Sequence, residues 1–323
     1  MEGSNRKGCI SQNPMNTNLY IVTAVFNPFG FKSRIRLYNH FKKHMADSGA
    51  KLFTVEAAFG HHPFEVTCTN DPMNLQVRTN QVLWHKERLI NLGMKKLFHA
   101  VPDANYLGWY DADITFANHN WVSEVTHQLS HLSVIQPFST AINLNSKGDP
   151  MWNCPSSMRS FIESRGFHQT PELPVSYTYK GHPGLAWNIT RDVYEGLGGL
   201  YDICVAGSAD TVMSNAFKGD YSAYLPVPQS DAMIDSMKKL QINSDKNVRG
   251  RIGFARGSIL HQWHGQSESR GYEKRWSIMS YHKYDPNTDV VNDGLGMLGW
   301  TGNKPELEDD IRLSLSARNE DAV

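Results

Sequence analysis

Cysteine is scarce in this sequence, and so are long apolar runs. The four cysteines among 323 residues stand at positions 9, 68, 154 and 204, and none belongs to a Cys-x-x-Cys pair. This spacing argues against a zinc ribbon or a disulfide framework and suits a reducing compartment. No apolar run approaches the ~20 residues that span a bilayer. Residues 1–18 are polar, do not resemble a signal peptide and are expected to be flexible. We therefore expect a cytoplasmic protein without membrane insertion.

The sequence also lacks an overall charge. Its 32 Lys and Arg balance its 32 Asp and Glu, so no global field draws the protein towards nucleic acid or a membrane. One segment departs from this balance, because residues 238–283 contain ten Lys or Arg against three acidic residues. This local excess has two interpretations that the sequence leaves open: a solvated basic surface, or a surface that faces a phosphate-bearing ligand.

Glycine-rich nucleotide loops are missing as well. Neither the Gly-x-Gly-x-x-Gly fingerprint nor the phosphate-loop signature occurs, which argues against a dinucleotide-binding Rossmann domain and a P-loop NTPase. What remains is a composition of 40% apolar and 20% charged residues, which is ordinary for a globular protein. The length suits one large domain or two smaller ones.

The first strongly patterned stretch is a strand–helix–strand unit. Residues 19–26 form a continuous β-branched and aromatic run, typical of a strand buried on both faces. An apolar stripe over 35–45 predicts a helix that Ser33 could cap, and residues 51–57 are the second strand. The order implies a parallel sheet, whose ligands bind beyond the carboxyl ends of the strands. The polar residues expected on that rim are Asn27, Arg34, Arg36 and Asp111.

A second stretch combines a buried strand with two carboxylates. Tyr106–Tyr110 is a short aromatic run, and Asp111 and Asp113 follow it directly. Carboxylates at the end of a buried strand repel each other and resist desolvation, so they need a cation or hydrogen-bond donors. A divalent metal would meet this need and also bind substrate phosphates. The alternative is a solvated turn, in which Asp is common.

Charged residues interrupt the apolar stripe of a helix predicted over residues 80–98. Lys86 and Glu87 lie within that stripe rather than opposite it. Because buried charges need partners, these two either pair at the edge of the stripe or reach a ligand site. The proline-rich segment 143–176 is expected to be an irregular insertion over the site, and residues 303–323 a loosely held charged tail.

Three residues of the second half complete the candidates. His261 and His264 stand three apart, and neutral imidazole is a ligand for divalent metals. A structural histidine pair is the alternative. Asp210 opens a predicted helix, where it either takes part in chemistry or only caps the helix.

Six motifs in their order resemble the nucleotide-sugar-dependent glycosyltransferases of the GT-A fold. The resemblance is narrower to bacterial and phage members with a galactosyltransferase-like region, and it spans roughly residues 19–300. In chain order the motifs are the first strand ending in Asn27-Pro28, Trp84–Asn91, Asp111-Ala112-Asp113, His182–Trp187, Gly198–Asp202 with Gly207–Asp210, and His261–Gly265 followed by Arg270–Tyr272 and Arg275.

The resemblance implies a Rossmann-like α/β fold of the GT-A type. It consists of a mixed, mainly parallel sheet flanked by helices, in a single large domain over residues 19–302. Residues 19–136 would bind the nucleotide sugar, and 137–302 would bind the acceptor and complete the metal site. The charged tail, 303–323, would lie outside this domain.

The resemblance also implies a cofactor and a donor site. Mn²⁺ or Mg²⁺ would bind Asp111, Asp113 and either His261 or His264, with His264 slightly favoured, and would stabilise the departing diphosphate. The donor is expected to be a UDP-sugar. The residues that would contact the nucleotide sugar are Thr23, Asn27, Arg34, Lys86, Asn91, Asp111, Ala112 and Trp187.

Asp210 lies where many inverting members have their general base. Those members usually carry an acidic residue just before it, where this chain has Ala209, so inversion and retention both stay open. Trp187 and Trp263 could stack on sugar rings or pack in the core.

The motifs do not specify the acceptor. A saccharide or cell-surface glycan precursor is favoured, and hydroxymethylated bases of phage DNA are the close alternative, since the basic segment is compatible with DNA. A protein acceptor is a further option. Two other classes compete: a non-catalytic nucleotide-sugar-binding module, and a haloacid-dehalogenase-like phosphatase, whose Asp-x-Asp-x-Thr signature residues 111–115 satisfy. That signature normally ends the first strand of its domain. The oligomeric state is not predicted.

Overall fold

The structure is a computed structural model that describes residues 18–166, 181–223 and 225–322. In chain order its elements are β1 (Leu19–Phe26), α1 (Lys32–Asp47), β2 (Lys51–Phe59), β3 (Asn74–Thr79), α2 (Lys86–Ala100), β4 (Tyr106–Tyr110), β5 (Ile114–Phe116), α3 (Trp121–Leu129), β6 (Val134–Gln136), β7 (Thr140–Leu144), β8 (Pro150–Pro155), α4 (Ser157–Gly166), β9 (Ala186–Thr190), α5 (Arg191–Leu197), α6 (Ala209–Phe217), α7 (Asp231–Asn247), β10 (Ile252–Phe254), β11 (Ser258–His261), the 3-10 helix η2 (Ser267–Arg270), α8 (Tyr272–Tyr281), β12 (Val290–Asn292), β13 (Leu298–Trp300) and α9 (Pro305–Ser316).

The main sheet has the strand order β10-β6-β9-β4-β1-β2-β3 in the part of the chain described. The strands β4, β1, β2 and β3 run parallel, as do β10 and β6. Only β9 runs antiparallel to its neighbours β4 and β6. The predicted mixed, mainly parallel sheet flanked by helices is therefore confirmed. Strands from before and after residue 137 share this sheet.

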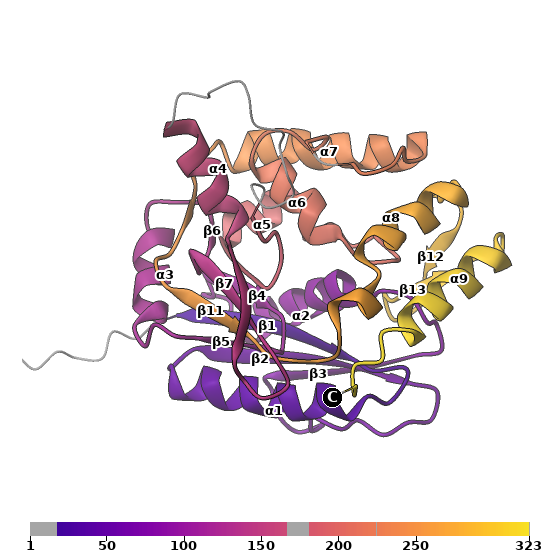
Figure 1. Ribbon diagram of the computed structural model, residues 1–323, viewed down its shortest axis with the longest axis horizontal. Helices are drawn as coiled ribbons and strands as arrows, with labels where there is room; N and C mark the ends of the chain where they lie inside the picture. Colours follow the sequence, from indigo (N-terminus) through magenta and orange to yellow (C-terminus); the bar gives the residue numbers. More distant parts are fainter. Residues whose placement is uncertain (1–17, 167–180, 224, 323) are drawn as a thin grey trace, which may run out of the picture.

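The first strand lies inside the sheet, between β4 and β2, and both of its faces are apolar. Successive strand side chains point to opposite faces. Leu19 and Ile21 pack in the core beneath α1 and α3, whereas Tyr20 and Val22 pack in the core beneath α2. Figure 1 shows α1 on one side of the sheet and α2, α6 and α7 on the other. Burying each such aliphatic side chain contributes about 1.5–3 kcal/mol.

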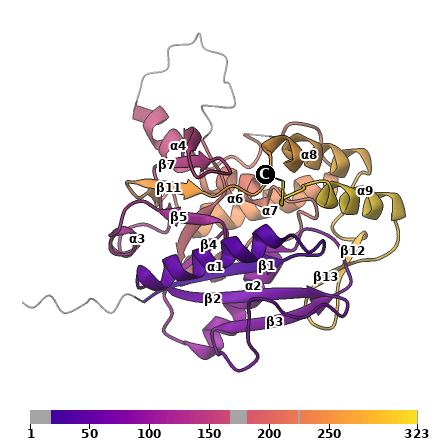
Figure 2. The ribbon, with the colours of Figure 1, turned by 60° about the horizontal axis from the view of Figure 1, so that its bottom comes forward.

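A smaller sheet begins where the chain leaves the main one. It has the order β5-β11-β7-β8 among the described residues, and Figure 2 shows β5, β7 and β11 together beside the main sheet. The chain passes from β4 to β5 through Asp111, Ala112 and Asp113, so the two carboxylates lie at the junction of the sheets. Backbone hydrogen bonds from Asp111 N–H to Leu185 and from Gln262 N–H to Asp113 hold the junction.

Some expectations about secondary structure were wrong. The strands β7 and β8 and the helix α4 occupy residues 140–166, where the prolines suggested an irregular insertion. Pro150 and Pro155 stand at the ends of β8, an edge strand on which proline is tolerated. Residues 167–176 of that expectation lie outside the described part. No helix among the described residues combines the length and the apolar character needed to cross a membrane.

The C-terminal segment is not loosely held. After α9 it returns to the start of α1, as Figure 1 shows for its yellow end. The Asp321 carboxylate accepts hydrogen bonds from the N–H groups of Lys32 and Ser33, at 2.9 and 2.7 Å. Ser33 was expected to cap α1, but it lies inside the helix and makes no capping hydrogen bond. Asp321, 288 residues away along the chain, takes that role.

Candidate functional site

A cleft opens at the carboxyl ends of β1 and β4, where the two sheets meet. Its walls come from β1, the β4–β5 junction, the segment before β9, the start of α6, the end of β11 and the C-terminal segment. The charged and polar residues that line it are Arg34, Lys86, Asp111, Asp113, His182, Asp210, His261, His264, Arg270, Arg275, Arg318 and Glu320. This is the rim on which parallel sheets bind their ligands.

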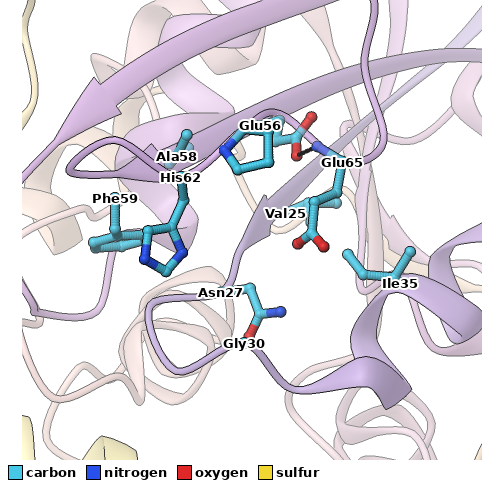
Figure 3. Close-up of a pocket in the computed structure, with 11 residues that line it drawn as sticks. Val25, Asn27, Gly30, Ile35, Glu56, Ala58, Phe59, His62 and Glu65 are labelled. Carbon is cyan, nitrogen blue, oxygen red and sulfur yellow. Dashed lines mark hydrogen bonds between the residues drawn. The ribbon is translucent and has the colours of Figure 1, made fainter.

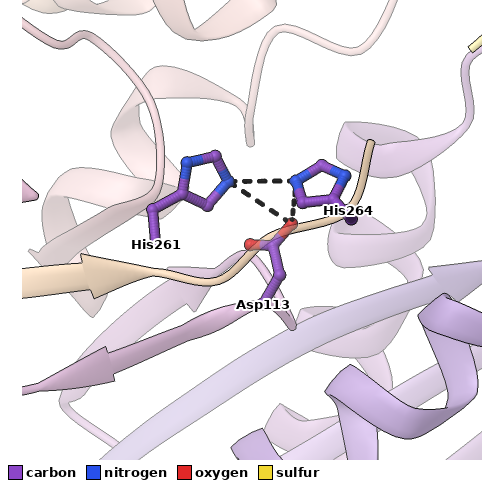
Figure 4. A group of neighbouring side chains, drawn as sticks. All are labelled: Asp113, His261 and His264. Atoms are coloured by element: carbon purple, nitrogen blue, oxygen red, sulfur yellow. Dashed lines mark hydrogen bonds and ion pairs between the residues drawn. The ribbon is translucent and has the colours of Figure 1, made fainter. Parts of the chain in front are cut away.

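Asp113, His261 and His264 form a candidate metal site (Figure 4). The Nε2 atoms of the two imidazoles lie 3.1 Å apart. Asp113 Oδ2 lies 2.9 Å from His264 Nε2 and 3.6 Å from His261 Nε2. The pairing of Ile114 with His261 between β5 and β11 brings these residues together. Three ligand atoms thus converge on one point, as a bound cation requires.

The surroundings of this cluster fit a metal ion. Asn143 Oδ1 lies 2.7 Å from His261 Nδ1 and can only accept a hydrogen bond, so we place the ring proton on Nδ1. That tautomer directs the lone pair of His261 Nε2 towards Asp113 and His264, the outer support that metal-binding histidines usually have. Asp113 Oδ1 is buried without a hydrogen-bond partner in the described structure.

The protonation states in the cluster also suit a cation. Burial lowers the pKa of His264 to about 4, which keeps the ring neutral at pH 7. Burial alone would raise the pKa of Asp113, but His264 and His261 outweigh it and hold that pKa well below its usual range. Metal ligands must be deprotonated to bind, and both groups meet this condition.

Lys86 balances the acidic side chains on the opposite wall of the cleft. Its Nζ atom lies 2.7 Å from Asp210 Oδ2, 3.1 Å from Asp111 Oδ1 and 3.5 Å from Glu87 Oε1. Burial alone would lower the pKa of Lys86, but the carboxylates of Asp111, Asp210 and Glu87 raise it well above its usual value. The structure thus shows the ion pair of Lys86 with Glu87, and Lys86 also lines the cleft. A contact of Lys86 with a ligand stays a prediction.

Asp111 lies in the cleft without joining the three-residue cluster. One of its oxygens pairs with Lys86, and among the described residues only Asp113, His261 and His264 have converging ligand atoms. Burial raises the pKa of Asp111 to about 6, partly offset by Lys86. Its role as a metal ligand stays a prediction.

Asp210 lines the cleft, and the backbone of Gly184 lies close to its carboxylate. Its Oδ2 atom bonds to Lys86, while its buried Oδ1 atom has no hydrogen-bond partner in the described structure. A Cβ atom on Gly184 would lie 2.9 Å from Asp210 Oδ2. Leu185 and Ser208, next to Gly184 and near Asp210, adopt left-handed backbone angles. Such strain persists where the surrounding structure enforces it, often at functional sites.

Arginines form the remaining wall. Arg34, Arg270, Arg275 and Arg318 all line the cleft. The guanidinium groups of Arg275 and Arg318 lie 5.3 and 5.0 Å from the ring centre of Trp84. Of the basic segment 238–283, Arg270 and Arg275 thus line the cleft. Their contact with a phosphate-bearing ligand stays a prediction. Arginine keeps its charge at all ordinary pH values and matches phosphate geometry.

Besides Asn27, three residues expected to contact the nucleotide sugar do not line the cleft. Thr23 is fully buried and donates a hydrogen bond to the Tyr110 carbonyl. Asn91 binds the loop after α5 through the backbone of Leu200. Trp187 is fully buried, so the core interpretation of this residue applies. We withdraw these residues from the donor site.

Asn27 lines a separate, smaller pocket beside the cleft. Its side chain exchanges hydrogen bonds with the backbone of Phe31 and closes the turn after β1. Figure 3 shows Asn27 facing Glu56, His62 and Glu65 across this pocket. Arg34 and Ala112, by contrast, line the main cleft. Their contact with a nucleotide sugar stays a prediction.

The sequence prediction missed several residues of the cleft. Arg318 and Glu320 belong to the tail that was expected to lie outside the domain, and no local pattern marks them. His182 had a usable signal, since it opens the His-Pro-Gly motif. Burial lowers its pKa to about 3.

No protein-family model and no curated protein matches the chain. Several solved structures do. The catalytic domain of Drosophila β1,4-galactosyltransferase 7 in complex with xylobiose is 10% identical, with 90% of this chain and 97% of that chain covered and a TM-score of 0.41. A mutant of that enzyme in complex with manganese, UDP-Gal and xylobiose gives a TM-score of 0.40.

Two microbial or viral systems add to this likeness. A protein described as a nucleotide-diphospho-sugar transferase from Desulfovibrio desulfuricans G20 is 10% identical, with 76% and 82% coverage and a TM-score of 0.31. A glycosyltransferase involved in glycosylation of the major capsid of PBCV-1 is 7% identical, with 91% and 98% coverage and a TM-score of 0.28. All of these proteins are described as glycosyltransferases or sugar transferases, the class that the sequence motifs resemble. The likeness is distant, so the proposal below rests on this chain's own side chains.

Proposed function

We propose that this protein is a metal-dependent glycosyltransferase that moves a sugar from a nucleotide-diphosphate sugar to a hydroxyl acceptor. One observation carries the proposal. A three-ligand metal cluster, an arginine wall and a carboxylate with an unpaired oxygen open on the same cleft. Cleavage of the donor leaves a diphosphate with several negative charges, and the cations of this cleft suit that leaving group.

The metal site and the arginines would both act on the diphosphate, in different ways. A divalent ion bound at Asp113, His261 and His264 would supply charge neutralisation to the leaving group. The arginines that line the same cleft can bind phosphate oxygens in pairs. Two imidazole ligands favour Mn²⁺ over Mg²⁺, which prefers oxygen ligands and retained waters.

Asp210 is the candidate general base. Asp210 lines the cleft, and its buried Oδ1 atom has no hydrogen-bond partner in the described structure. A small rotation of the carboxylate would turn this oxygen to the cleft, where it would accept the proton of an acceptor hydroxyl. Lys86 binds the other oxygen at 2.7 Å and holds the carboxylate in place. Gly184 leaves room for this arrangement.

A row of paired residues in the small sheet supports a saccharide acceptor. Ile114, His261, Asn143 and Trp152 are partners in register across β5, β11, β7 and β8. Residues paired across strands share a face of the sheet. At about 4.8 Å per strand, the backbone of Trp152 lies roughly 10 Å from that of His261.

Trp152 is more exposed than the neighbouring row of paired residues on the same face of the small sheet. Phe116, Ile259, Ala141 and Cys154 are paired in the same way and pack against the core. Trp152 lies on the same face, yet its exposed fraction is 47%. An exposed aromatic ring on the same sheet face as His261, with its backbone roughly 10 Å away, suits the apolar face of a sugar ring. A modified DNA base has no comparable support among the described residues.

The phosphatase reading has less support. The Asp-x-Asp motif follows β4, and the strands β1, β2 and β3 precede it in the chain, whereas the phosphatase signature normally ends the first strand of its domain. Asp111, the nucleophile in that reading, is paired with Lys86. A non-catalytic binding module stays as the second candidate, and the experiment below separates the two.

The test measures release of nucleotide diphosphate from UDP-, GDP- and dTDP-linked sugars, with Mn²⁺ present or chelated. Binding of Mn²⁺ alone is followed by electron paramagnetic resonance, with Zn²⁺ and Fe²⁺ as competitors because they also accept histidine and carboxylate ligands. Asp113→Asn and His264→Ala are the metal-site variants. His131→Ala removes an exposed histidine as the matched control.

We expect metal-dependent turnover of one donor, lost at least 100-fold in both metal-site variants and retained in His131→Ala. Asp210→Asn should keep Mn²⁺ binding and lower transfer by about 10²–10⁴-fold. Tight metal-dependent donor binding without turnover, on any hydroxyl acceptor tried, would favour the binding module. Absence of both metal and donor binding would refute the proposal.

A further inference from the structure

The C-terminal segment 318–322 is anchored on both sides of the cleft. On one side, Asp321 accepts the N–H groups at the start of α1. On the other, the Trp263 indole N–H donates to the Ala322 carbonyl at 3.0 Å. Trp263 stands between the two histidines of the candidate metal site. The segment therefore bridges the first helix and the metal-binding strand.

The metal-binding loop is shaped to admit this segment. Gly265 follows His264 and has a φ of +89°. A Cβ atom on Gly265 would lie 2.8 Å from the carbonyl oxygen of Asn319 and 3.2 Å from the Cα atom of Glu320. Both neighbours are backbone atoms, which cannot move aside as a side chain could. Close packing of the segment thus requires glycine here.

Between these anchors, Glu320 joins two arginines of the cleft wall. Its oxygens accept hydrogen bonds from Arg34 Nε and Nη2, both at 2.7 Å. Arg318 Nε lies 2.8 Å from the same carboxylate. The Glu320 side chain is only 2% exposed, yet it borders the cleft together with both arginines. Two guanidinium groups are held by one buried carboxylate.

We propose that segment 318–322 forms part of the donor site, with Glu320 as a positioning residue that orients Arg34 and Arg318 towards the donor diphosphate. This inference rests on the function proposed above. A free arginine side chain loses rotamer entropy when it is fixed. Glu320 fixes both side chains before the ligand arrives, and such preorganisation strengthens binding.

Positioning and simple charge predict effects of opposite sign. Replacing Glu320 by glutamine removes one negative charge from the cleft wall, which by charge alone would tighten the binding of an anion. If Glu320 positions the arginines, the same change weakens binding, because the guanidinium groups lose their shared anchor. The sign of the change therefore separates the two effects.

The experiment uses the full chain and inorganic pyrophosphate, which has the diphosphate of a donor without its base or sugar. Calorimetry measures pyrophosphate affinity in saturating Mn²⁺, and electron paramagnetic resonance measures Mn²⁺ affinity without pyrophosphate. The variants are Glu320→Gln, Glu320→Asp and Arg318→Met. Glu306→Gln, which changes an exposed glutamate of α9, is the matched control.

We expect Glu320→Gln to bind Mn²⁺ as the native protein does and pyrophosphate at least ten-fold more weakly. Glu320→Asp should restore part of that loss, and Glu306→Gln should bind like the native protein. Arg318→Met leaves the Arg34–Glu320 pair in place and should also weaken pyrophosphate binding, so it serves if Glu320→Gln does not fold.

Unchanged or tighter pyrophosphate binding by folded Glu320→Gln would overturn the inference and leave the segment a structural role only. Unchanged pyrophosphate binding by Arg318→Met would show that Arg318 does not contact the diphosphate and would also overturn the inference. Failure of the proposed function has a different signature, because the native protein would then bind neither Mn²⁺ nor pyrophosphate in its presence.

Discussion

Single side chains set the charge of the cleft, and Lys86 is the clearest case. Its ammonium group contacts the carboxylates of Asp111, Asp210 and Glu87. Without it, three acidic groups would be buried together, and burial and mutual repulsion would protonate some of them. The sequence indicated that a charge within an apolar stripe needs a partner. It did not indicate that the partners would come from residues 25 and 124 positions away.

Gly184 offers a test of Asp210 that leaves the carboxylate itself unchanged. A Cβ atom at this position would lie 2.9 Å from Asp210 Oδ2, so Gly184→Ala should push the carboxylate away from Lys86. We expect kcat for sugar transfer to fall on the order of ten-fold or more, because small misplacements of catalytic groups are costly. Mn²⁺ affinity should not change.

Gly294→Ala is the control for this substitution, since a Cβ atom there meets nothing within 4 Å. Native kcat in Gly184→Ala would contradict the role given to Asp210.

Among the elements, α1 depends on a residue from the other end of the chain. Asp321 satisfies two N–H groups of its first turn, so Asp321→Ala should lower the free energy of unfolding by about 1 kcal/mol. Ser33→Ala should have little effect, because the Ser33 hydroxyl is buried without a hydrogen-bond partner in the described structure. Urea unfolding of both variants measures this. A larger loss of unfolding free energy in Ser33→Ala than in Asp321→Ala would mean that Ser33 caps the helix, as the sequence suggested.

The edge strand β8 carries the proposed acceptor contact. Trp152→Ala should leave slow donor hydrolysis by water unchanged and raise the KM for a saccharide acceptor about ten-fold, since the proposal places the acceptor and not the donor against this ring. A panel of p-nitrophenyl glycosides serves as the acceptor probe. Met151→Ala is the control, because Met151 is 55% exposed on the same strand and points to the other face. Equal effects of the two substitutions would exclude a specific contact.

At the scale of the whole molecule, the C-terminal segment links acid stability to the cleft. Burial alone would raise the pKa of Glu320, but Arg34 and then Arg318 outweigh it and lower that pKa to about 2, from an ordinary 4.5. A carboxylate with a depressed pKa stabilises the folded state above its unfolded pKa, and this stability is lost as the pH falls from about 4.5 to about 2. The full contribution is on the order of 3 kcal/mol at most.

We therefore expect the difference in unfolding free energy between the native protein and Glu320→Gln to be largest near neutral pH. It should shrink by about 1 kcal/mol or more at pH 3.5. Urea unfolding at pH 7 and pH 3.5 measures it, with Glu306→Gln as the exposed control. A difference that does not depend on pH would mean that the Glu320 carboxylate is not held by its arginines.

The sequence by itself determined the elements whose signals are local. β1 and β4 were predicted with their observed bounds, because continuous apolar runs mark strands buried on both faces. The position of Asp111 and Asp113 at a strand end followed from the same signal. The mainly parallel sheet followed from the order of strands and helices.

Only the tertiary structure decided which distant residues meet. Thr23 could not be separated from its apolar neighbours by pattern, because every residue of a strand buried on both faces looks alike. Asn143 and His261 are 118 positions apart, and Asp321 and Ser33 are 288 apart. Residue periodicity identifies a buried face, but the partner across that face is set by strand register and by the path of the chain. The hydrogen bond of Asn143 to the candidate metal site and the contacts of Glu320 with Arg34 and Arg318 therefore became visible only in the fold.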